Sequence, residues 1–434
     1  MSLVTLRFRG ALTDLRAEDR VALFDRMPDR DDLLHDTVGA IIDVVRREGD
    51  SALRSLAREY DQVKLDRLEV PKAEWTRALE GIGPELRTAL ERAARNIERV
   101  HRAMLPAATE VEVEPGILVG RRPDPLGRVG VYAPGGKASY PSSVLMGVVP
   151  ARVAGVGEVI VCSPPAAGGR PLPGVLAACA IAGVDRVFAV GGAGAVAAMA
   201  YGTGSIPRVD RIVGPGNAYV ATAKLMVSDV VAIDSPAGPS ELLVLADDSA
   251  DPALVAREMI AQAEHDELAC AVTVALGAAL AERIEASLIA QAAATGRREI
   301  VRKALAAQGG VLVATTREQA TAFATLYAPE HLLIAMRDAG QVRDAVRHAG
   351  TIFEGVSSSV SFGDYMTGAN HVLPTGGLAR AYSGLSTLDF VRWTTWQRVT
   401  PEAAARLAPD VGAFADAEGL DGHARSARAW GTVA

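Results

Sequence analysis

Gln262 and His265 are side chains whose types and spacing could do chemistry together. They are three residues apart in the polar segment 258–266, downstream of a predicted helix start at Asp251 and Pro252. If the helix continues, both lie on one face, and an amide oxygen and an imidazole nitrogen can bind one metal ion. Such a pair at a polar helix end is more often solvated surface, so a metal site requires other polar segments that converge on it.

Glu330 and His331 form a second candidate pair, directly before an apolar run. A carboxylate and an imidazole side by side are two proton-transfer groups with different pKa values, which suits successive acid and base steps. A random Glu-His dipeptide is usually surface. Here the preceding Pro329 and the adjoining predicted strand favour a positioned pair at the edge of a sheet.

A polar loop over residues 363–377 supplies further candidates. It is rich in Gly, Asp, Asn and His, and a loop of this length is uncommon unless it has a function. Asp364 and His371 are its candidate ligands for a metal or a substrate. Glu418 and His423 add a carboxylate and an imidazole near the C-terminus, where a lone His is most often a helix-end residue near solvent.

Three glycine-rich segments follow apolar runs, at residues 132–137, 190–195 and 213–217. Glycines at strand ends let the backbone approach a ligand, and a following helix N-terminus favours a phosphate. Each segment taken alone is equally well a tight turn. Three of them on one sheet favour a nucleotide-sized ligand, although none has the GxGxxG spacing of a standard dinucleotide site.

The elements that position these segments alternate between strand and helix, which indicates parallel sheets covered on both faces. Predicted strands are residues 129–133, 159–162, 187–190, 230–233, 242–245, 272–275, 311–314, 332–335 and 351–353. Predicted helices include residues 11–27, 31–60, 84–101, 173–182 and 193–200. Two α/β units are expected, preceded by a mostly helical segment and followed by a helical element from about residue 386 that contains Trp393 and Trp396.

Composition is that of an ordinary globular protein with more than one domain. The chain has 434 residues, 49% hydrophobic and 22% charged, and its net charge of -7 offers no basic surface for nucleic acid or a membrane. No apolar run is long enough to span a bilayer, and the N-terminus has no signal-peptide core. Cys162, Cys179 and Cys270 lack CxxC spacing and are expected to be buried thiols. We expect a cytoplasmic protein.

Together, these motifs resemble those of histidinol dehydrogenases, the zinc- and NAD-dependent enzymes of the last step of histidine biosynthesis. The similarity covers almost the whole chain. The motifs are Val131-Tyr-Ala-Pro-Gly-Gly, Gly214-Pro-Gly-Asn-Ala, Ala237-Gly-Pro-Ser240-Glu, Gln262-Ala-Glu-His-Asp, Ala328-Pro-Glu-His-Leu and the run from Gly363-Asp-Tyr to His371-Val-Leu-Pro-Thr. The last of these is long and very specific.

The resemblance implies an α/β fold of two interleaved, incomplete Rossmann-like domains with parallel sheets, plus small helical elements at both ends. The implied segments are 1–27 for the N-terminal helical element, 28–131 with 241–322 for the first α/β domain, 132–240 with 323–385 for the second, glycine-rich domain on the NAD side, and 386–434 for the C-terminal helical element. It also implies a homodimer in which this last element docks on the partner subunit and contributes to its active site.

The resemblance also assigns roles to residues. One Zn²⁺ per subunit is expected on Gln262, His265, Asp364 and His423. Glu330 and His331 correspond to the catalytic pair. NAD contacts correspond to Tyr132, Asn217 and Gly194, and substrate contacts to Ser240, His371 and Glu418 together with His331 and the four metal ligands. The implied reaction is the oxidation of L-histidinol to L-histidine through histidinal, with two NAD and one water.

Two departures from the family pattern concern specificity. Gly194 stands where the family commonly has a Gln that contacts NAD. Residues 356–360 lack the Pro-Glu pair that usually precedes the Gly363-Asp-Tyr motif. Neither departure involves the expected zinc ligands or the Glu-His pair, but both leave room for a different substrate or cofactor preference.

Three alternative functions remain open. A relative on the same scaffold could oxidise another small alcohol, such as a polyol or a sulfonate, although Glu418 and His371 favour histidinol. In a zinc hydrolase Glu330 would activate a metal-bound water, but hydrolysis needs no dinucleotide site. A non-catalytic α/β binding protein would leave the polar Gln, His, Asp and Glu residues unexplained.

Overall fold

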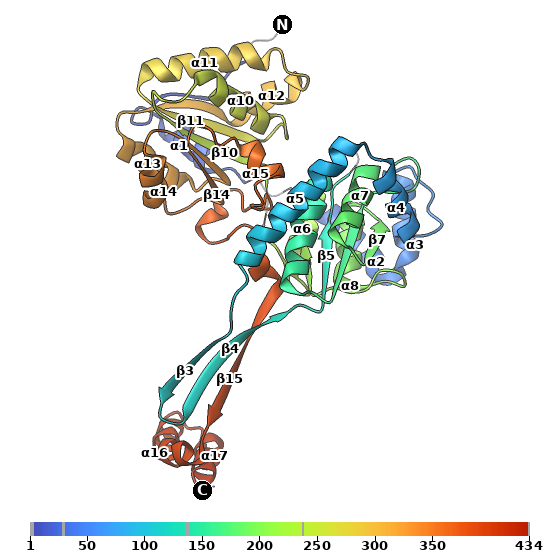
Figure 1. The fold of residues 1–434 in the computed structure, drawn as a ribbon, viewed down its shortest axis with the longest axis vertical. Helices are drawn as coiled ribbons and strands as arrows, with labels where there is room; N and C mark the ends of the chain where they lie inside the picture. The colour runs from blue at the N-terminus through green and yellow to red at the C-terminus, as the bar shows by residue number, and fades with distance from the viewer. Residues whose placement is uncertain (1–3, 28–30, 136–138, 237, 433–434) are drawn as a thin grey trace.

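Two α/β units and a projecting arm make up the structure, a computed structural model that describes residues 4–27, 31–135, 139–236 and 238–432 (Figure 1). Gly136 and Lys137 of the first glycine-rich segment, and Ala237, lie outside the described residues. Each unit is built on one six-stranded sheet, and the arm is a three-stranded sheet that ends in two helices.

The first unit has a fully parallel sheet in the order β1-β12-β11-β10-β13-β14. Its strands are β1 (Phe8–Ala11), β10 (Glu241–Ala246), β11 (Cys270–Leu276), β12 (Gly309–Ala314), β13 (His331–Ala335) and β14 (Thr351–Glu354). Its helices are α1 (Ala17–Phe24), α10 (Pro252–Ala263), α11 (Ala278–Ala292), α12 (Arg298–Gln308), α13 (Arg317–Tyr327), α14 (Ala339–Ala345) and the short α15 (Val360–Tyr365).

Alternation along β10 explains how this sheet is covered. Leu242 and Val244 pack with residues of α10, α11 and α12, whereas Leu243 and Leu245 pack with residues of α1, α13 and α14. Because successive side chains of a strand point to opposite faces, a continuous apolar run is expected where both faces are buried. The predicted strand therefore sits in the middle of a helix–sheet–helix sandwich.

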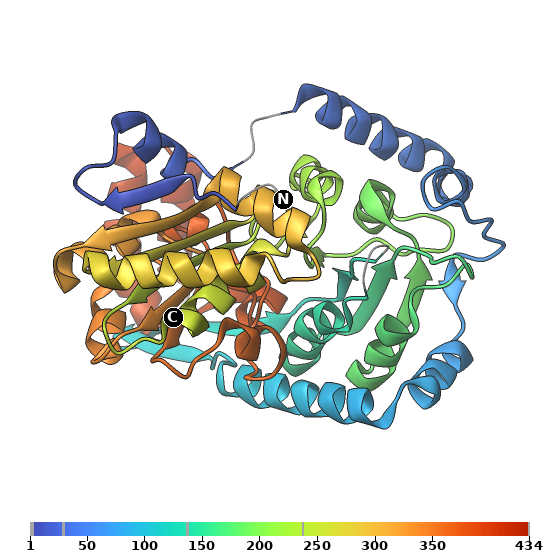
Figure 2. The ribbon, with the colours of Figure 1, turned by 90° about the horizontal axis from the view of Figure 1, so that it is seen from above.

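The second unit has the sheet order β2-β7-β6-β5-β8-β9, parallel except for β2. Its strands are β2 (Glu69–Val70), β5 (Arg128–Tyr132), β6 (Glu158–Ser163), β7 (Arg186–Ala189), β8 (Arg211–Val213) and β9 (Ala232–Ile233). Its helices are α2 (Asp32–Glu48), α3 (Asp50–Tyr60), α4 (Lys72–Gly81), α5 (Pro84–Ala103), α6 (Pro141–Ala154), α7 (Pro173–Ala182), α8 (Gly192–Tyr201) and α9 (Ala218–Met226). Helices α5, α6 and α7 cover one face and α2, α8 and α9 the other (Figure 2).

The arm corrects the prediction of a wholly helical C-terminal element. After the 3-10 turns η1 (Leu378–Arg380) and η2 (Thr387–Phe390), residues Val391–Val399 form strand β15, which pairs antiparallel with β4 (Ile117–Pro125). Strand β3 (Thr109–Glu114) completes this sheet, and α16 (Pro401–Ala417) and α17 (Asp421–Trp430) close its end. Trp393 and Trp396 lie in β15, where alternating β-branched and aromatic residues suit a strand.

The implied domain segments also need correction. Strands β10, β11 and β12 pair in one sheet with β13 and β14, although the prediction placed these two groups in different domains. Strand β5, assigned to the first domain, pairs with β6 and β8 of the glycine-rich unit. Strand β1 also pairs with β12, so the first 27 residues contribute to the first sheet. Strand pairing joins distant segments, and local periodicity carries no information about it.

The predictions of individual strands, and of the burial of the cysteines, are confirmed. Nine predicted strands coincide with observed strands to within a few residues, and the helix at Pro173–Ala182 has the predicted bounds. The three cysteines are buried and free, and burial raises the pKa of the Cys162 and Cys270 thiols to about 12. Within the described residues, no helix is both long and apolar enough to cross a membrane.

His101, in the last turn of α5, makes the stability of the fold depend on pH. Its side chain is buried, neither ring nitrogen has a hydrogen-bond partner among the described residues, and burial lowers its pKa from 6.5 to about 4. Because the unfolded chain takes up this proton at a higher pH, the stability contribution is complete above pH 6.5 and is lost as the pH falls toward 4. The full loss is on the order of 3 kcal/mol.

We therefore expect His101→Leu to flatten the acid side of the stability profile. Melting temperatures of the wild type and the variant should be compared at about pH 7.5 and about pH 5. The wild type should lose more stability than the variant between the two. Equal losses would show that the pKa of His101 is the same in the folded and the unfolded protein.

Candidate active site

Glu330 and His331 stand at the amino end of β13, beside the amino end of its parallel neighbour β10. The Glu330 carboxylate accepts a hydrogen bond from the Glu241 backbone N–H at 2.7 Å. His331 Nδ1 lies 2.9 Å from the Glu241 carbonyl oxygen. Both side chains are buried. The predicted pair is therefore held at a sheet edge by the backbone of the adjacent strand.

This arrangement sets the roles of the two ring nitrogens of His331. A carbonyl oxygen only accepts hydrogen bonds, so Nδ1 must carry a proton to bond with Glu241. Nε2 is buried without a hydrogen-bond partner among the described residues, and it lies 3.6 Å from Asp364 Oδ1. Burial alone would lower the pKa of His331, but Glu330 and Asp364 raise it well above its ordinary value. Nε2 is therefore the atom that can exchange a proton with a ligand.

Asp364 belongs to α15, whose first N–H, that of Val360, donates to the Glu258 carboxylate of α10 at 3.1 Å. Burial tends to raise the pKa of Asp364, but the neighbouring His331, His371 and His265 lower it overall. The Asp364 carbonyl oxygen also lies 3.0 Å from His371 Nδ1. A carboxylate kept ionised among three imidazoles is a suitable ligand for a cation.

Gln262 and His265 lie at the end of α10, but the helix stops before His265. Asp251 caps the helix as predicted, by accepting from Ala253 N–H at 2.8 Å. The helix ends at Ala263, and His265 follows in a turn, exposed, with its N–H bonded to the Gln262 carbonyl. Gln262 is buried, and its side-chain Nε2 has no partner in the described part of the protein. Its amide can therefore turn toward a bound group.

The predicted loop after Gly363 connects the two units. Asn370 donates to the Met146 carbonyl oxygen of α6 at 2.8 Å, and Asn96 of α5 donates to the Met366 carbonyl oxygen at 2.7 Å. Further along, Gly376 N–H donates to the Glu241 carboxylate. These bonds place the polar loop between the second unit and the sheet edge that carries Glu330 and His331.

The carboxyl edge of the second sheet faces the same region. Tyr140, just after the first glycine-rich segment, is close enough to contribute to the raised pKa of Tyr365, the neighbour of Asp364. Tyr132 ends β5, and its hydroxyl accepts from Gly192 N–H at 3.1 Å. Burial raises the pKa of Tyr132 to about 12, so this hydroxyl stays neutral. The glycine-rich turns thus lie at the edge of the sheet nearest the polar cluster.

At this edge of the sheet, the position of Gly214 cannot accommodate any larger residue. Its φ is +116°, and a Cβ there would lie 2.1 Å from the Tyr132 carbonyl oxygen. The turn is held by a buried ion pair, since Lys224 and Asp234 contact each other and also bond to the Gly214 carbonyl and N–H. The turn after β8 is therefore rigid before any ligand arrives.

The other two predicted cofactor contacts have structural roles of their own. Asn217 caps α9 by accepting from Val220 N–H at 3.2 Å. Gly194 lies inside α8, and a Cβ there would approach Leu56 at 3.0 Å and Leu53 at 3.4 Å. Leucines of α3 thus occupy the direction in which a side chain at this position would extend. A cofactor contact from Gly194 stays a prediction, and it would have to come from the backbone.

Among the predicted substrate and metal residues, Ser240, Glu418 and His423 have no hydrogen bond or ion pair to this cluster within the described residues. Ser240 is half-buried just before β10, and its carbonyl accepts from Cys270 N–H at 3.0 Å. Glu418 and His423 are exposed at the end of the arm, far from α10 and α15 (Figure 1). Within the described residues, no three His, Cys, Asp or Glu side chains gather as a metal site. Within one chain, His265 therefore lies near Asp364 and Gln262 lies three residues before His265, whereas His423 is far from them.

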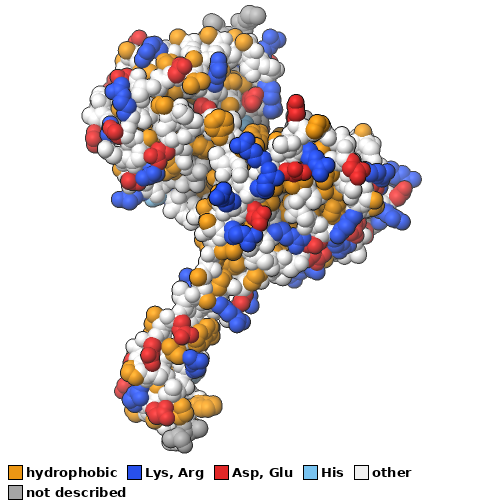
Figure 3. All heavy atoms as spheres, in the orientation of Figure 1, with side chains coloured by type: hydrophobic (Ala, Val, Ile, Leu, Met, Phe, Trp, Pro, Cys, Tyr) orange, Lys and Arg blue, Asp and Glu red, His pale blue; other side chains and the backbone are white. Residues whose placement is uncertain are grey.

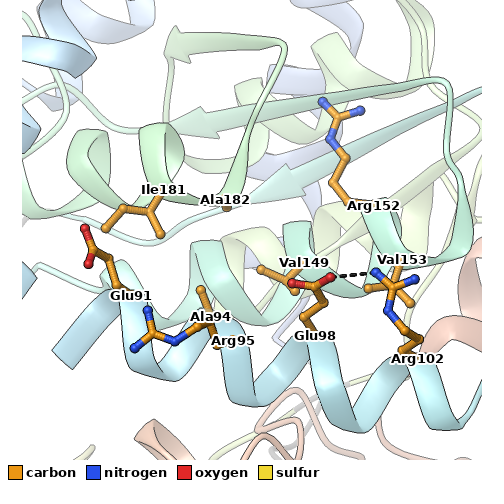
Figure 4. Close-up of a pocket in the computed structure, with 10 residues that line it drawn as sticks. All are labelled: Glu91, Ala94, Arg95, Glu98, Arg102, Val149, Arg152, Val153, Ile181 and Ala182. Atoms are coloured by element: carbon orange, nitrogen blue, oxygen red, sulfur yellow. Dashed lines mark hydrogen bonds and ion pairs between the residues drawn. The ribbon is translucent and has the colours of Figure 1, made fainter. Parts of the chain in front are cut away.

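Surface grooves lie elsewhere. Figure 4 shows one of about 400 Å³ between α5 and the ends of α6 and α7, where Glu98 and Arg102 form an ion pair. A second groove, of about 620 Å³, lies between α13 and α14. None of the predicted site residues lines either groove, so neither groove bears on the chemistry proposed for the chain.

Sequence reasoning missed the residues that support the site. Glu241 was part of a recognised motif but received no role, and Arg26 and Glu258 received none. A carboxylate directly before an apolar strand is a weak signal for Glu241. Nothing in the sequence identifies Arg26, because its partners lie more than two hundred residues away.

The comparisons with known proteins agree with this architecture. The histidinol dehydrogenase family model matches residues 25–430. A histidinol dehydrogenase of Methanosarcina mazei is 49% identical over 395 residues, 91% of each chain, and one of Natronomonas pharaonis is 48% identical over 96% of this chain and 98% of its own. The crystal structure of the Elizabethkingia anophelis histidinol dehydrogenase superposes with a TM-score of 0.93 at 33% identity, covering 98% of both chains. This chain is an enzyme of the histidinol dehydrogenase family.

Proposed function

We propose that this chain oxidises L-histidinol to L-histidine through histidinal, with zinc and two molecules of NAD. The observation that carries the proposal is the buried Glu330–His331 pair, in which His331 Nε2 has no hydrogen-bond partner among the described residues and lies 3.6 Å from Asp364. Such a pair can accept protons in two successive steps. The names of the relatives supply the substrate.

The donors of this chain fit a zinc ion in their chemistry. Gln262 offers a buried amide whose Nε2 has no partner in the part of the chain that the structure describes, Asp364 an ionised carboxylate, and His265 an imidazole near that carboxylate. These are three of the four predicted ligands, and His423 would be the fourth. A bound zinc ion supplies a Lewis-acidic centre that orients the substrate, which raises the rate by positioning.

His331 is the base for the first oxidation in this proposal. Its Nδ1–H is committed to the Glu241 carbonyl, so Nε2 must take the hydroxyl proton of histidinol. Glu330, which raises the pKa of His331 against the effect of burial, stabilises the protonated ring that results.

Glu330 is the base for the second oxidation. Its carboxylate is buried and held by the Glu241 N–H at 2.7 Å, with His331 Nδ1 at 3.4 Å. In the proposal it takes a proton from the water that adds to histidinal. A carboxylate can accept that proton, whereas the amide of Gln cannot.

The glycine-rich edge of the second sheet would hold NAD, which accepts the hydride when it is bound. Two features support this placement. The Gly214 turn is fixed by Lys224 and Asp234, so its backbone is ready to approach a ligand. The start of α9 follows this turn, and helix N-termini favour phosphate groups.

We also propose a homodimer whose arms complete the sites. The arm leaves large apolar side chains exposed, among them Phe414 at 72% and Trp430 at 68%. On the visible face of the arm, apolar side chains lie among charged and polar ones, and the tip projects away from both units (Figure 3). A surface of this kind on a thin element needs a partner, and a second copy of the chain would bring Glu418 and His423 to the site that lacks them.

The decisive experiment counts reduced nicotinamide for each histidinol consumed by the purified protein with zinc and NAD. The proposal predicts two per substrate, with histidine as product. A chelator should abolish the reaction while leaving the fold largely intact, and added zinc should restore it. Substrate cleavage without nicotinamide reduction would indicate a hydrolase. Reduction with a polyol or a sulfonate but not with histidinol would indicate a different alcohol substrate.

A further inference from the structure

Arg26 is a buried cation at the end of the N-terminal element. Its side chain is only 1% exposed, and its guanidinium makes a two-bond pair with Glu241, from Nε at 3.0 Å and from Nη2 at 3.1 Å. Nη2 also donates to the Tyr327 carbonyl oxygen at 2.7 Å, and the guanidinium carbon lies 3.6 Å from the centre of the Tyr327 ring. Arg26 thus ties the start of β10 to the end of α13.

Both contacts of Arg26, Glu241 and Tyr327, lie next to the Glu330–His331 pair, in space or along the chain. Glu241 and Glu330 exchange bonds: each backbone N–H donates to the carboxylate of the other, at 2.7 Å and 3.3 Å. The Glu241 carbonyl lies 2.9 Å from His331 Nδ1. On the other side, Tyr327 ends α13 only three residues before Glu330, with the left-handed Ala328 (φ 49°) between them.

Electrostatics makes Arg26 necessary for this arrangement. Burial raises the pKa of the Glu241 carboxyl, the nearby Glu330 raises it further, and Arg26 opposes both effects. Two buried carboxylates with no cation would repel each other, and one would take up a proton. A protonated Glu241 would accept hydrogen bonds less well, which weakens its hold on Glu330 N–H and Gly376 N–H.

We propose that Arg26 is a positioning residue for the Glu330–His331 pair and acts through Glu241. The inference rests on the proposed function, because it assigns Arg26 to the step chemistry of the pair. It also gives the N-terminal element a task beyond its strand in the first sheet. Without the two-bond contact, the loop between α13 and β13 is free to shift, and the reacting groups lose their alignment.

The test compares Arg26→Gln, Arg26→Lys and Glu241→Gln in each oxidation step. We expect Arg26→Gln to lower kcat of both steps by about tenfold to a hundredfold, with KM for NAD and zinc content unchanged. The kcat of Arg26→Lys should lie between those of the wild type and Arg26→Gln, since Lys keeps the charge but not the two-bond geometry. The double variant Arg26→Gln/Glu241→Gln should have a kcat only slightly lower than that of Glu241→Gln alone, because Arg26 acts through Glu241.

The matched control is Arg186→Gln. Arg186 makes a similar two-bond pair with Glu69, at 3.0 Å and 2.7 Å, at the other edge of the second sheet. Its loss should lower the melting temperature without changing kcat. If Arg26→Gln likewise changed only the melting temperature, or lowered kcat no more than the control, Arg26 would be merely structural and the proposal would be wrong.

A second measurement needs no activity, which separates this inference from the proposed function. The melting-temperature shifts of Arg26→Gln and Glu330→Gln should not add in the double variant, because Glu241 links the two residues. The shifts of Arg186→Gln and Glu330→Gln should add. Additive shifts for Arg26 would overturn the inference. Non-additive shifts in a protein that does not oxidise histidinol would support the link and reject the function.

Discussion

Glu330→Gln is expected to lower the rate of histidinal oxidation by about a hundredfold to ten-thousandfold, the usual contribution of a general base. The amide keeps the shape of the side chain and can still accept from Glu241 N–H, so the fold should be preserved. It cannot take a proton from water. Oxidation of histidinol to histidinal should fall much less, because the proposed mechanism assigns that step to His331. Rapid-mixing measurements of reduced nicotinamide, started from histidinol or from histidinal, separate the two steps.

His331→Asn provides the complementary comparison. It removes Nε2, the atom assigned to the hydroxyl proton, and should impair the alcohol step at least as strongly as Glu330→Gln impairs the aldehyde step. Circular dichroism and zinc content serve as controls for folding and metal binding. Small, equal losses at both steps in both variants would mean that the pair supports the sheet edge and does not carry out the chemistry.

The second large effect is the recovery of histidine formation from two variants that each lack it. In the proposed function, Glu330→Gln chains lack the base of the second oxidation, and His423→Ala chains lack the zinc ligand from the arm. If each site combines the Glu330 of one subunit with the His423 of the other, a mixed dimer contains one site with no altered residue. Random exchange of equal amounts should therefore restore about a quarter of wild-type activity.

Exchange must be confirmed by mass for this result to be decisive. The controls are each variant alone, and a mixture of Glu330→Gln with His331→Asn, whose altered residues lie in the same unit of the same chain. In that mixture every mixed-dimer site carries one altered residue of the pair, so no activity should return. Confirmed exchange without recovery in the first mixture would show that each chain completes its own site.

The sequence by itself determined the local features of this protein. The strand at β13 and the place of Glu330 and His331 at its start followed from a polar dipeptide before an apolar run. Asp251 and Pro252 marked the start of α10. These features depend on periodicity and capping within a few residues, where chain propensity and burial pattern act together. The motifs also pointed to the family, which the comparisons showed.

Only the tertiary structure decided how distant segments meet. In the structure, β10 pairs with β13, and Trp393 and Trp396 lie in strand β15 of the arm. His423 lies far from Asp364 within one chain. The fold also brings Arg26 to Glu241, across 215 residues of sequence. Contacts of this kind arise from the packing of the whole chain and from the energetic need to neutralise buried charge, and neither leaves a periodic signal in the residues nearby.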